Sequence, residues 1–298
     1  MNMQLSKSEY IMFLKQPAWL WLKKNDPKKL PPVDDATQAI FDAGFLFESY
    51  AEKLFPDGIK LNWEGYKEYK DLPKRTNEAI FSGAKTIFQP RFETNDITCI
   101  CDVVVFVGKN TVDLYEIKSS AGPKPYHEHD LAFQAIVLED SGFKVRNMAV
   151  IHVNKNYIRH GEVDAKQITD ISDLTEKVKK RLKSTRLNIN KALDVMKQKE
   201  MPNPSPSLCQ LNSIFEWLDI YKSLKNIEPG DGSIYDLYNP SAALIGKLEE
   251  KKIDKIMDIP VNFNGLSEKQ NWQLRAYKER KIYINRGKIN DFLDKLKY

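Results

Sequence analysis

An apolar stretch in the first half of the chain, Thr98–Ser120, contains three ionisable residues that are out of place: Asp102, Glu116 and Lys118. The stretch is rich in Val, Ile, Phe and Tyr and is broken at Gly108-Lys109-Asn110, which predicts two strands joined by a short turn. Side chains alternate between the two faces of a strand, so Glu116 and Lys118 share one face of the second strand. Asp102 lies in the first strand. If the strands pair, one sheet face carries all three charges, which is unfavourable unless they pair with one another or bind a metal.

Such a cluster has a known chemical use. Two carboxylates can hold a hard divalent cation such as Mg²⁺ or Mn²⁺ that keeps several waters. The cation lowers the pKa of a bound water and offsets charge that develops on a phosphate, and a neighbouring lysine can orient that water or contact the phosphate. The pattern therefore predicts a phosphodiester hydrolase. The alternative is a buried ion-pair cluster that only joins two strands.

The same residues resemble a known nuclease motif. Asp102 and Glu116-Ile117-Lys118 are similar to the core of the PD-(D/E)xK nuclease superfamily, with Cys101 at the position of the proline. Leu131-Ala132-Phe133-Gln134 resembles the glutamine motif of the RecB-like branch, which includes the CRISPR adaptation nucleases; Leu138 stands where that branch usually has a tyrosine. The resemblance implies an α/β, restriction-endonuclease-like fold, in which a mixed sheet is flanked by helices.

The resemblance also implies roles for individual residues. Asp102 and Glu116 would bind Mg²⁺ or Mn²⁺, and the main-chain carbonyl of Ile117 would be a further ligand. Lys118 would position the attacking water and stabilise the transition state. Gln134 would orient Lys118 or the phosphate.

An additional metal ligand is expected from the helix predicted at Gln38–Phe55. Its helical spacing puts Glu48 on the same face as Phe41, Gly44, Ala51 and Phe55, the face that should pack on the core. RecB-like nucleases bring an acidic residue or a histidine from this helix to the metal, which points to Glu48. The alternatives are an ordinary half-exposed glutamate at this position and a competing role for Glu52.

The segment that follows the second motif strand should border the substrate. Ser119 begins a loop that continues to Pro123, and such a loop at a strand end can line a substrate groove. A helix is predicted at Tyr126–Ser141, with Gln134 on one of its faces. That glutamine can bind a phosphate, the attacking water or the lysine, or it can be an ordinary surface residue. His127 and His129 are two apart and do not face one another on a helix, which argues against a histidine metal site.

Bulk properties suit a soluble nucleic-acid enzyme without requiring one. The chain has 298 residues, a net charge of +5, no apolar run long enough to span a membrane and no signal-peptide pattern, so a cytoplasmic location is expected. Its three cysteines form no C-x-x-C pair. Many RecB-like relatives hold an iron–sulfur cluster with four cysteines, the first before a proline and three late in the chain. Here Gln16 precedes Pro17 and only Cys209 comes late, so no cluster is expected.

Two domains are predicted from composition and pattern: a nuclease-like domain over 1–225, with its core at about 36–160, and a small helical module over 226–298. Met201–Ser207 is a proline-rich linker. The basic helix at Ile171–Lys199 is better interpreted as a solvated brace than as a phosphate-binding track. The C-terminal module resembles a degraded helix–hairpin–helix element, and a plain helical cap is the alternative.

The end of the chain carries a second resemblance. Leu266–Gln270 and Phe292–Tyr298 are similar to the connector of a bacterial family in which a RecB-like nuclease half precedes a second module with an Asp-x-Glu exonuclease motif. The sequence thus predicts a metal-dependent nuclease whose partner is nucleic acid, most readily DNA. The competing hypothesis is a non-catalytic nucleic-acid-binding or interaction module on a nuclease fold.

Overall fold

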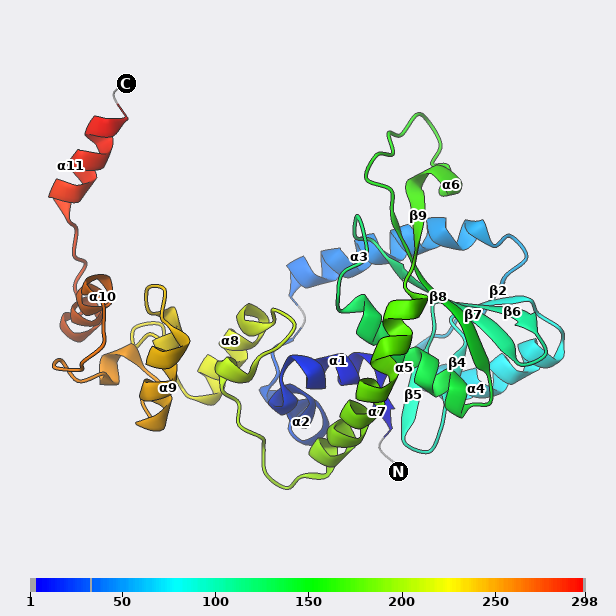
Figure 1. Ribbon diagram of the computed structural model, residues 1–298, viewed down its shortest axis with the longest axis horizontal. Helices are drawn as coiled ribbons and strands as arrows, with labels where there is room; N and C mark the ends of the chain where they lie inside the picture. Colours follow the sequence, from blue (N-terminus) through cyan, green and yellow to red (C-terminus); the bar gives the residue numbers. More distant parts are fainter. Residues whose placement is uncertain (1–3, 33, 297–298) are drawn as a thin grey trace. The chain divides into compact units, whose positions relative to one another are not determined.

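The chain forms two compact units that divide after Pro204 (Figure 1), and the computed structural model describes residues 4–32 and 34–296. The division falls inside the predicted linker Met201–Ser207. The helix Ile214–Leu224 groups with the second unit, whereas the predicted domain 1–225 placed it with the first. None of the helices in the described ranges combines the length and the apolar character that crossing a membrane requires.

The first unit is built on a six-stranded mixed sheet (Figure 1), which confirms the predicted α/β class. In spatial order its strands are β2 (Ile59–Lys60), β3 (Thr86–Phe88), β6 (Val103–Gly108), β7 (Thr111–Lys118), β8 (Lys144–Val153) and β9 (Thr169–Asp173). β6 and β7 form the predicted antiparallel hairpin, and β8 pairs parallel to β7 on its other side. A small sheet lies in the same unit, with the order β1 (Leu5–Ser6), β5 (Ile97–Ile100) and β4 (Arg91–Glu93).

The chain passes twice between the two sheets. The segment from Lys85 to Glu93 contains two strands, β3 and β4, and the first motif strand is likewise divided into β5 and β6. The breaks lie side by side, because the Gln89 N–H donates to the Asp102 carbonyl at 3.1 Å and the Cys101 N–H to the Pro90 carbonyl at 3.0 Å. Gln89 has φ +55°, the left-handed region that turns the chain sharply. Asp102 therefore lies at the crossing, one residue before β6.

Helices cover the sheet. In the first unit they are α1 (Lys7–Lys15), α2 (Pro17–Asn25), α3 (Asp35–Ala51), α4 (Gly65–Phe81), α5 (His127–Asp140), α6 (Ala165–Ile168) and α7 (Thr175–Lys197), with single 3₁₀ turns at Pro27–Lys29 and Glu52–Leu54. A capping box of Ser6 and Glu9 opens α1, and Pro17 begins α2.

The basic helix α7 packs along α5. It starts at Thr175 rather than at the predicted Ile171, because the preceding residues form β9. Val178, Ile189 and Ala192 on its inner face are buried. Its arginines form ion pairs with α5. These contacts fix α5 from outside, in agreement with the interpretation of α7 as a brace.

The predicted inner face of α3 is wrong over the first half of the helix. Phe41 was expected in the core but has 47% of its surface exposed, and Phe45 has 64%. Only the second half packs, where Phe47 and Ala51 join the cluster that includes Ile117. Helical periodicity identifies a stripe but not how far the neighbouring sheet extends beneath it. Figure 1 shows α3 running past the edge of the sheet.

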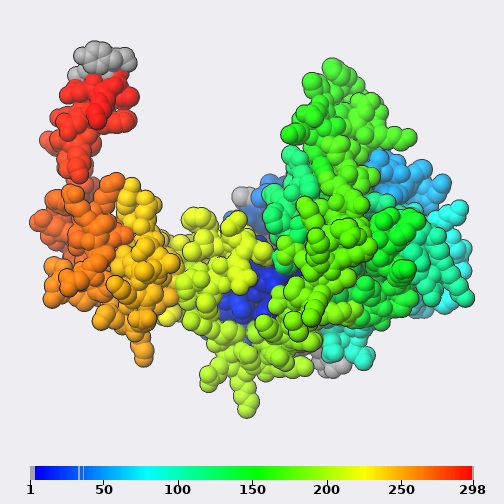
Figure 2. Space-filling view, in the orientation of Figure 1, coloured from blue at the N-terminus to red at the C-terminus, as the bar shows by residue number. Residues whose placement is uncertain are grey.

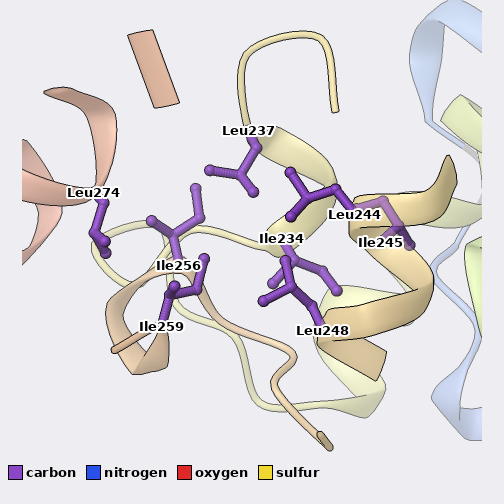
Figure 3. Close-up of a cluster of buried hydrophobic side chains, with 8 residues drawn as sticks. All are labelled: Ile234, Leu237, Leu244, Ile245, Leu248, Ile256, Ile259 and Leu274. Atoms are coloured by element: carbon purple, nitrogen blue, oxygen red, sulfur yellow. The ribbon is translucent and has the colours of Figure 1, made fainter. Parts of the chain in front are cut away.

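The second unit is a small helical module. It contains α8 (Ile214–Leu224), α9 (Ala242–Glu250), α10 (Glu268–Glu279), α11 (Arg286–Lys295) and 3₁₀ turns at Pro206–Leu208, Ile234–Asp236 and Ile256–Asp258. α9 ends at Glu250 and is soon followed by Lys252, which has a left-handed backbone conformation. Figure 3 shows the apolar core that joins the two later 3₁₀ turns to α9 and α10. Figure 2 shows the chain in space-filling form.

Phe133→Ala should lower the free energy of unfolding by about 3–5 kcal/mol, the usual range for removing a buried aromatic ring. Phe133 is fully buried in α5 and stacks on Tyr10 of α1, with 5.0 Å between ring centroids. The urea dependence of circular dichroism measures the loss. Phe81→Ala is the matched control, since Phe81 is 89% exposed and its loss should change stability by no more than about 0.5 kcal/mol. Equal effects in the two variants would contradict this packing.

Candidate functional site

The centre of the candidate site is the carboxylate of Glu116 in β7. Its side chain is only 1% exposed. Lys118 of the same strand donates to Oε1 at 2.6 Å, and Gln134 Nε2 of α5 donates to Oε2 at 2.6 Å. Lys7 Nζ of α1 contacts both oxygens, at 2.8 and 3.0 Å. Although burial acts against its charge, Lys118 and Lys7 hold the pKa of Glu116 well below its usual range.

Asp102 joins this cluster from the neighbouring strand. β6 pairs with β7 only as far as Val103 opposite Tyr115, so the next N–H of β7 on that side, that of Ile117, has no ladder partner there. It donates instead to Asp102 Oδ2 at 2.7 Å. Burial and the nearby charge of Glu116 raise the pKa of Asp102 to about 7. The predicted meeting of Asp102, Glu116 and Lys118 is thus present.

Lys118 links two carboxylates. Besides Glu116 it pairs with Asp130 Oδ2 of α5 at 3.5 Å. Burial opposes the ammonium charge, but Glu116 and Asp130 outweigh it and raise the pKa of Lys118. The side chain keeps 28% of its surface exposed. An ammonium group that is both ionised and accessible can contact a phosphate or a water.

Gln134 lies where the sequence predicted, but its partner is different. It is fully buried, and Nε2 donates to Glu116 and to the Asp130 carbonyl at 3.2 Å. The expectation that it orients Lys118 or a phosphate stays a prediction, because its contact in the structure is Glu116. Within the described residues its Oε1 is buried without a hydrogen-bond partner.

Lys7, like Asp130, belongs to the cluster although no pattern in the sequence indicated it. It is the first residue of α1, and the capping box around Ser6 was visible in the sequence. Nothing in that pattern indicated that its side chain reaches a strand 109 residues further along the chain. The pairing of β1 with β5, which places Leu5 beside Ile97, is what brings α1 to the site.

Glu48 and Ser119 are two further predicted site residues. Glu48 accepts a hydrogen bond from Gln89 Nε2 at 2.8 Å, and its competitor Glu52 pairs with Lys60 at 2.6 Å. In the described part of the chain no group of three or more His, Cys, Asp or Glu side chains has metal-binding geometry. Ser119 is exposed directly after Lys118, at the end of β7. The roles assigned to Glu48 and Ser119 stay predictions.

His127 contributes no positive charge near neutral pH. The Lys124 N–H donates to its Nδ1 at 3.1 Å, so the ring proton of the neutral form is on Nε2. Burial and, next, the charge of Lys118 lower the pKa of His127 to about 4. The charge of the site near neutral pH is therefore set by its carboxylates and its two lysines.

The donor atoms fit a hard divalent cation. Carboxylate and carbonyl oxygens are the ligands that Mg²⁺ and Mn²⁺ prefer, and Asp102, Glu116 and the Ile117 carbonyl would supply them. Among the described residues, Asp102 has a partner at Oδ2 only. The Ile117 N–H orients this carboxylate and leaves Oδ1 for a ligand. An arrangement of this kind can hold a cation beside an accessible ammonium group.

Asp102→Asn should gain stability relative to the wild type as pH rises from about 4 to about 8. The pKa of Asp102 rises from 3.8 to about 7 on folding, so within this window the folded protein retains a proton that the unfolded chain releases. Ionised Asp102 consequently lowers stability as pH increases, and the effect is complete above pH 7. Asparagine does not ionise, yet its oxygen can still accept from Ile117. Melting temperatures in EDTA measure the difference, and a difference that does not vary with pH would contradict the raised pKa.

Comparisons with known proteins give weak similarities in structure only. No protein-family model matches the chain, and no curated protein matches it. Three solved structures are similar to part of this chain. A protein from Eubacterium rectale described as an exonuclease has 14% identity and a TM-score of 0.36, with 65% of this chain and 81% of that chain covered. A phage-related exonuclease from Haemophilus somnus 129PT has 15% identity and a TM-score of 0.25, with 65% and 95% covered. An alkaline exonuclease from Laribacter hongkongensis has 10% identity and a TM-score of 0.26, with 66% and 92% covered.

Proposed function

We propose that the chain is a divalent-metal-dependent nuclease that hydrolyses phosphodiester bonds, with DNA as the expected substrate. The observation that supports this most directly is the cluster around Glu116: a buried carboxylate, an oriented Asp102 on the adjacent strand, and the accessible ammonium group of Lys118 beside both. Phosphoryl transfer needs mainly positioning and stabilisation of charge, and these groups can supply both.

Asp102 and Glu116 are the proposed ligands of Mg²⁺ or Mn²⁺, with the Ile117 carbonyl as a third oxygen and Glu48 as a further predicted ligand. Bound there, the cation would supply a water of lowered pKa and offset charge on the phosphate. The protein orients the ligands, since Ile117 fixes Asp102 and Gln134 fixes Glu116. Both hydrogen bonds come from rigid elements, β7 and α5.

Lys118 has the role of holding the attacking water and neutralising the phosphate oxygens. Its contact with Asp130 keeps the side chain directed along the end of β7. Its raised pKa keeps this ammonium group charged, so Lys118 acts as a cation and not as a proton donor. Gln134 acts on the reaction through Glu116.

A second candidate is a non-catalytic nucleic-acid-binding module, and one observation favours it. Both oxygens of Glu116 already have donors, from Lys7, Lys118 and Gln134. A carboxylate satisfied in this way is also what a purely structural ion-pair cluster requires. Metal binding discriminates between the two candidates.

Lys118→Ala should reduce metal-dependent cleavage of labelled DNA by roughly a hundredfold or more, as removal of a donor to a developing oxyanion does. Glu116 keeps Lys7 and Gln134 as partners, so the fold should persist. Cleavage is measured on single-stranded and duplex DNA with Mn²⁺, Mg²⁺ or EDTA.

Lys109→Ala is the matched control for that experiment, because Lys109 is exposed in the turn at the other end of the hairpin. Its activity should equal that of the wild type. Equal cutting by Lys118→Ala and the wild type would indicate a contaminant or a site elsewhere. Bound but uncut DNA in both proteins would favour the binding module.

Mn²⁺ should raise the melting temperature of the wild type by about 5 °C, since a ligand that binds only the folded state stabilises it. The shift should be larger at about pH 8 than at about pH 6, because the cation needs ionised Asp102, whose pKa is about 7. Asp102→Asn should abolish the shift. Asp113→Asn should retain it, as Asp113 lies in β7 with Glu116 but pairs with Arg146. No shift in the wild type would refute the metal site.

A further inference from the structure

Lys7 is a cation that the nuclease motif does not account for. Its ammonium group bridges the two oxygens of Glu116 at 2.8 and 3.0 Å, and the side chain is 21% exposed. Burial opposes its charge, but Glu116 and Asp102 nevertheless hold the pKa of Lys7 well above the ordinary value. The residue is therefore a permanent positive charge at the proposed ligand of a divalent cation.

The backbone of Lys7 is held in place by a strand pairing and by a helix cap. β1 pairs in parallel with β5, with Ser6 opposite Thr98. Ser6 is also the N-cap of α1, and Glu9 closes the capping box by accepting from the Ser6 N–H at 2.9 Å. Lys7 follows immediately, so its backbone is held while its long side chain remains the adjustable part.

A cation that binds Glu116 must take the place of one existing donor, and Lys7 is the one best able to leave. Gln134 is fully buried and also bonded to the Asp130 carbonyl. Lys118 has a second carboxylate, Asp130, to remain with. Among the described residues Glu116 is the only carboxylate paired with Lys7.

The charges of the cluster show what a released Lys7 can bind. Asp102, Glu116 and Asp130 carry three negative charges when ionised, and Lys7 and Lys118 carry two positive ones. A divalent cation changes this net charge from one negative to one positive. A phosphodiester group carries one negative charge and would neutralise the site.

We propose that Lys7 is a substrate-binding residue that alternates between two anions: it neutralises Glu116 in the metal-free protein and, once the divalent cation occupies Glu116, binds a phosphate of the nucleic acid. This inference rests on the proposed function. It predicts opposite effects of removing Lys7, with tighter binding of the metal and weaker binding of DNA. A purely structural ion pair predicts weaker binding of both, because its loss disorders Glu116.

The first arm of the test measures the affinity of the protein for Mn²⁺ in the absence of DNA, by electron paramagnetic resonance at pH 8.5. Lys7→Met should bind Mn²⁺ on the order of threefold tighter or more, since a nearby positive charge has been removed. Lys7→Arg should remain close to the wild type. Lys24→Met is the matched control: Lys24 pairs with Glu9 at 2.7 Å beside the same helix start but lies outside the cluster, so Mn²⁺ affinity should not change.

The second arm measures DNA binding in saturating Mn²⁺. The probe is a fluorescent single-stranded oligodeoxynucleotide with phosphorothioate linkages, which resist cleavage. Lys7→Met should bind it more weakly, and the slope of log affinity against log salt should fall by about 0.7, the value for one lost phosphate contact. Lys7→Arg and Lys24→Met should keep the slope of the wild type.

The outcomes separate the two proposals. Tighter Mn²⁺ binding together with a reduced salt slope supports the role of Lys7. If wild-type Mn²⁺ binding depends on Asp102 but Lys7→Met leaves it unchanged or weaker, the role of Lys7 is refuted and the proposed nuclease function stands. An unchanged salt slope in Lys7→Met refutes it as well. If the wild type binds no Mn²⁺, both proposals are refuted.

Discussion

The structure of the first unit depends on the need to neutralise one buried carboxylate. An isolated charge in a protein interior is strongly unfavourable, and Glu116 is almost completely removed from water. Three hydrogen-bond donors from α1, β7 and α5 satisfy it. These three elements are distant in sequence, so the fold of the unit is also the means by which a single carboxylate is kept ionised. The same arrangement brings two ammonium groups, those of Lys7 and Lys118, to one carboxylate.

The second constraint is geometric and comes from the two crossings between the sheets. Because β3 ends and β6 begins at these crossings, the Ile117 N–H of β7 lies beyond the start of β6 and is left for the Asp102 side chain. A continuous strand would have used that N–H in its ladder and left Asp102 without its orienting donor. The left-handed Gln89, which hydrogen-bonds to Asp102 through its backbone and to Glu48 through its side chain, belongs to the same junction. An apparent irregularity in the sheet is thus what arranges the acidic residues.

The sequence predicted the parts of the site that rest on local periodicity. Alternation along β7 was sufficient to place Glu116 and Lys118 together. The helical spacing of α5 left open whether Gln134 is buried or on the surface, and the structure buries it because α5 is covered on all sides from Asp130 to Leu138. The sheet crossings were not predictable, because Cys101 and Pro90 look like ordinary members of apolar runs. The prediction of the inner face of α3 was wrong for a related reason, since periodicity does not reveal where the supporting sheet ends. Lys7 was missed because its partner is set by the β1–β5 pairing, a long-range contact without a local signature.

The parallel pairing of β1 with β5 has a consequence for how the protein is made. The first strand leaves the ribosome early, but its partner at Ile97–Ile100 is synthesised much later, and Glu116 follows 109 residues after Lys7. Until then the N-terminal segment has neither its strand partner nor its counter-ion. The cluster around Glu116 can form only after Gln134 has also emerged. Assembly of the site during synthesis therefore waits for α5, the last of its three elements in chain order.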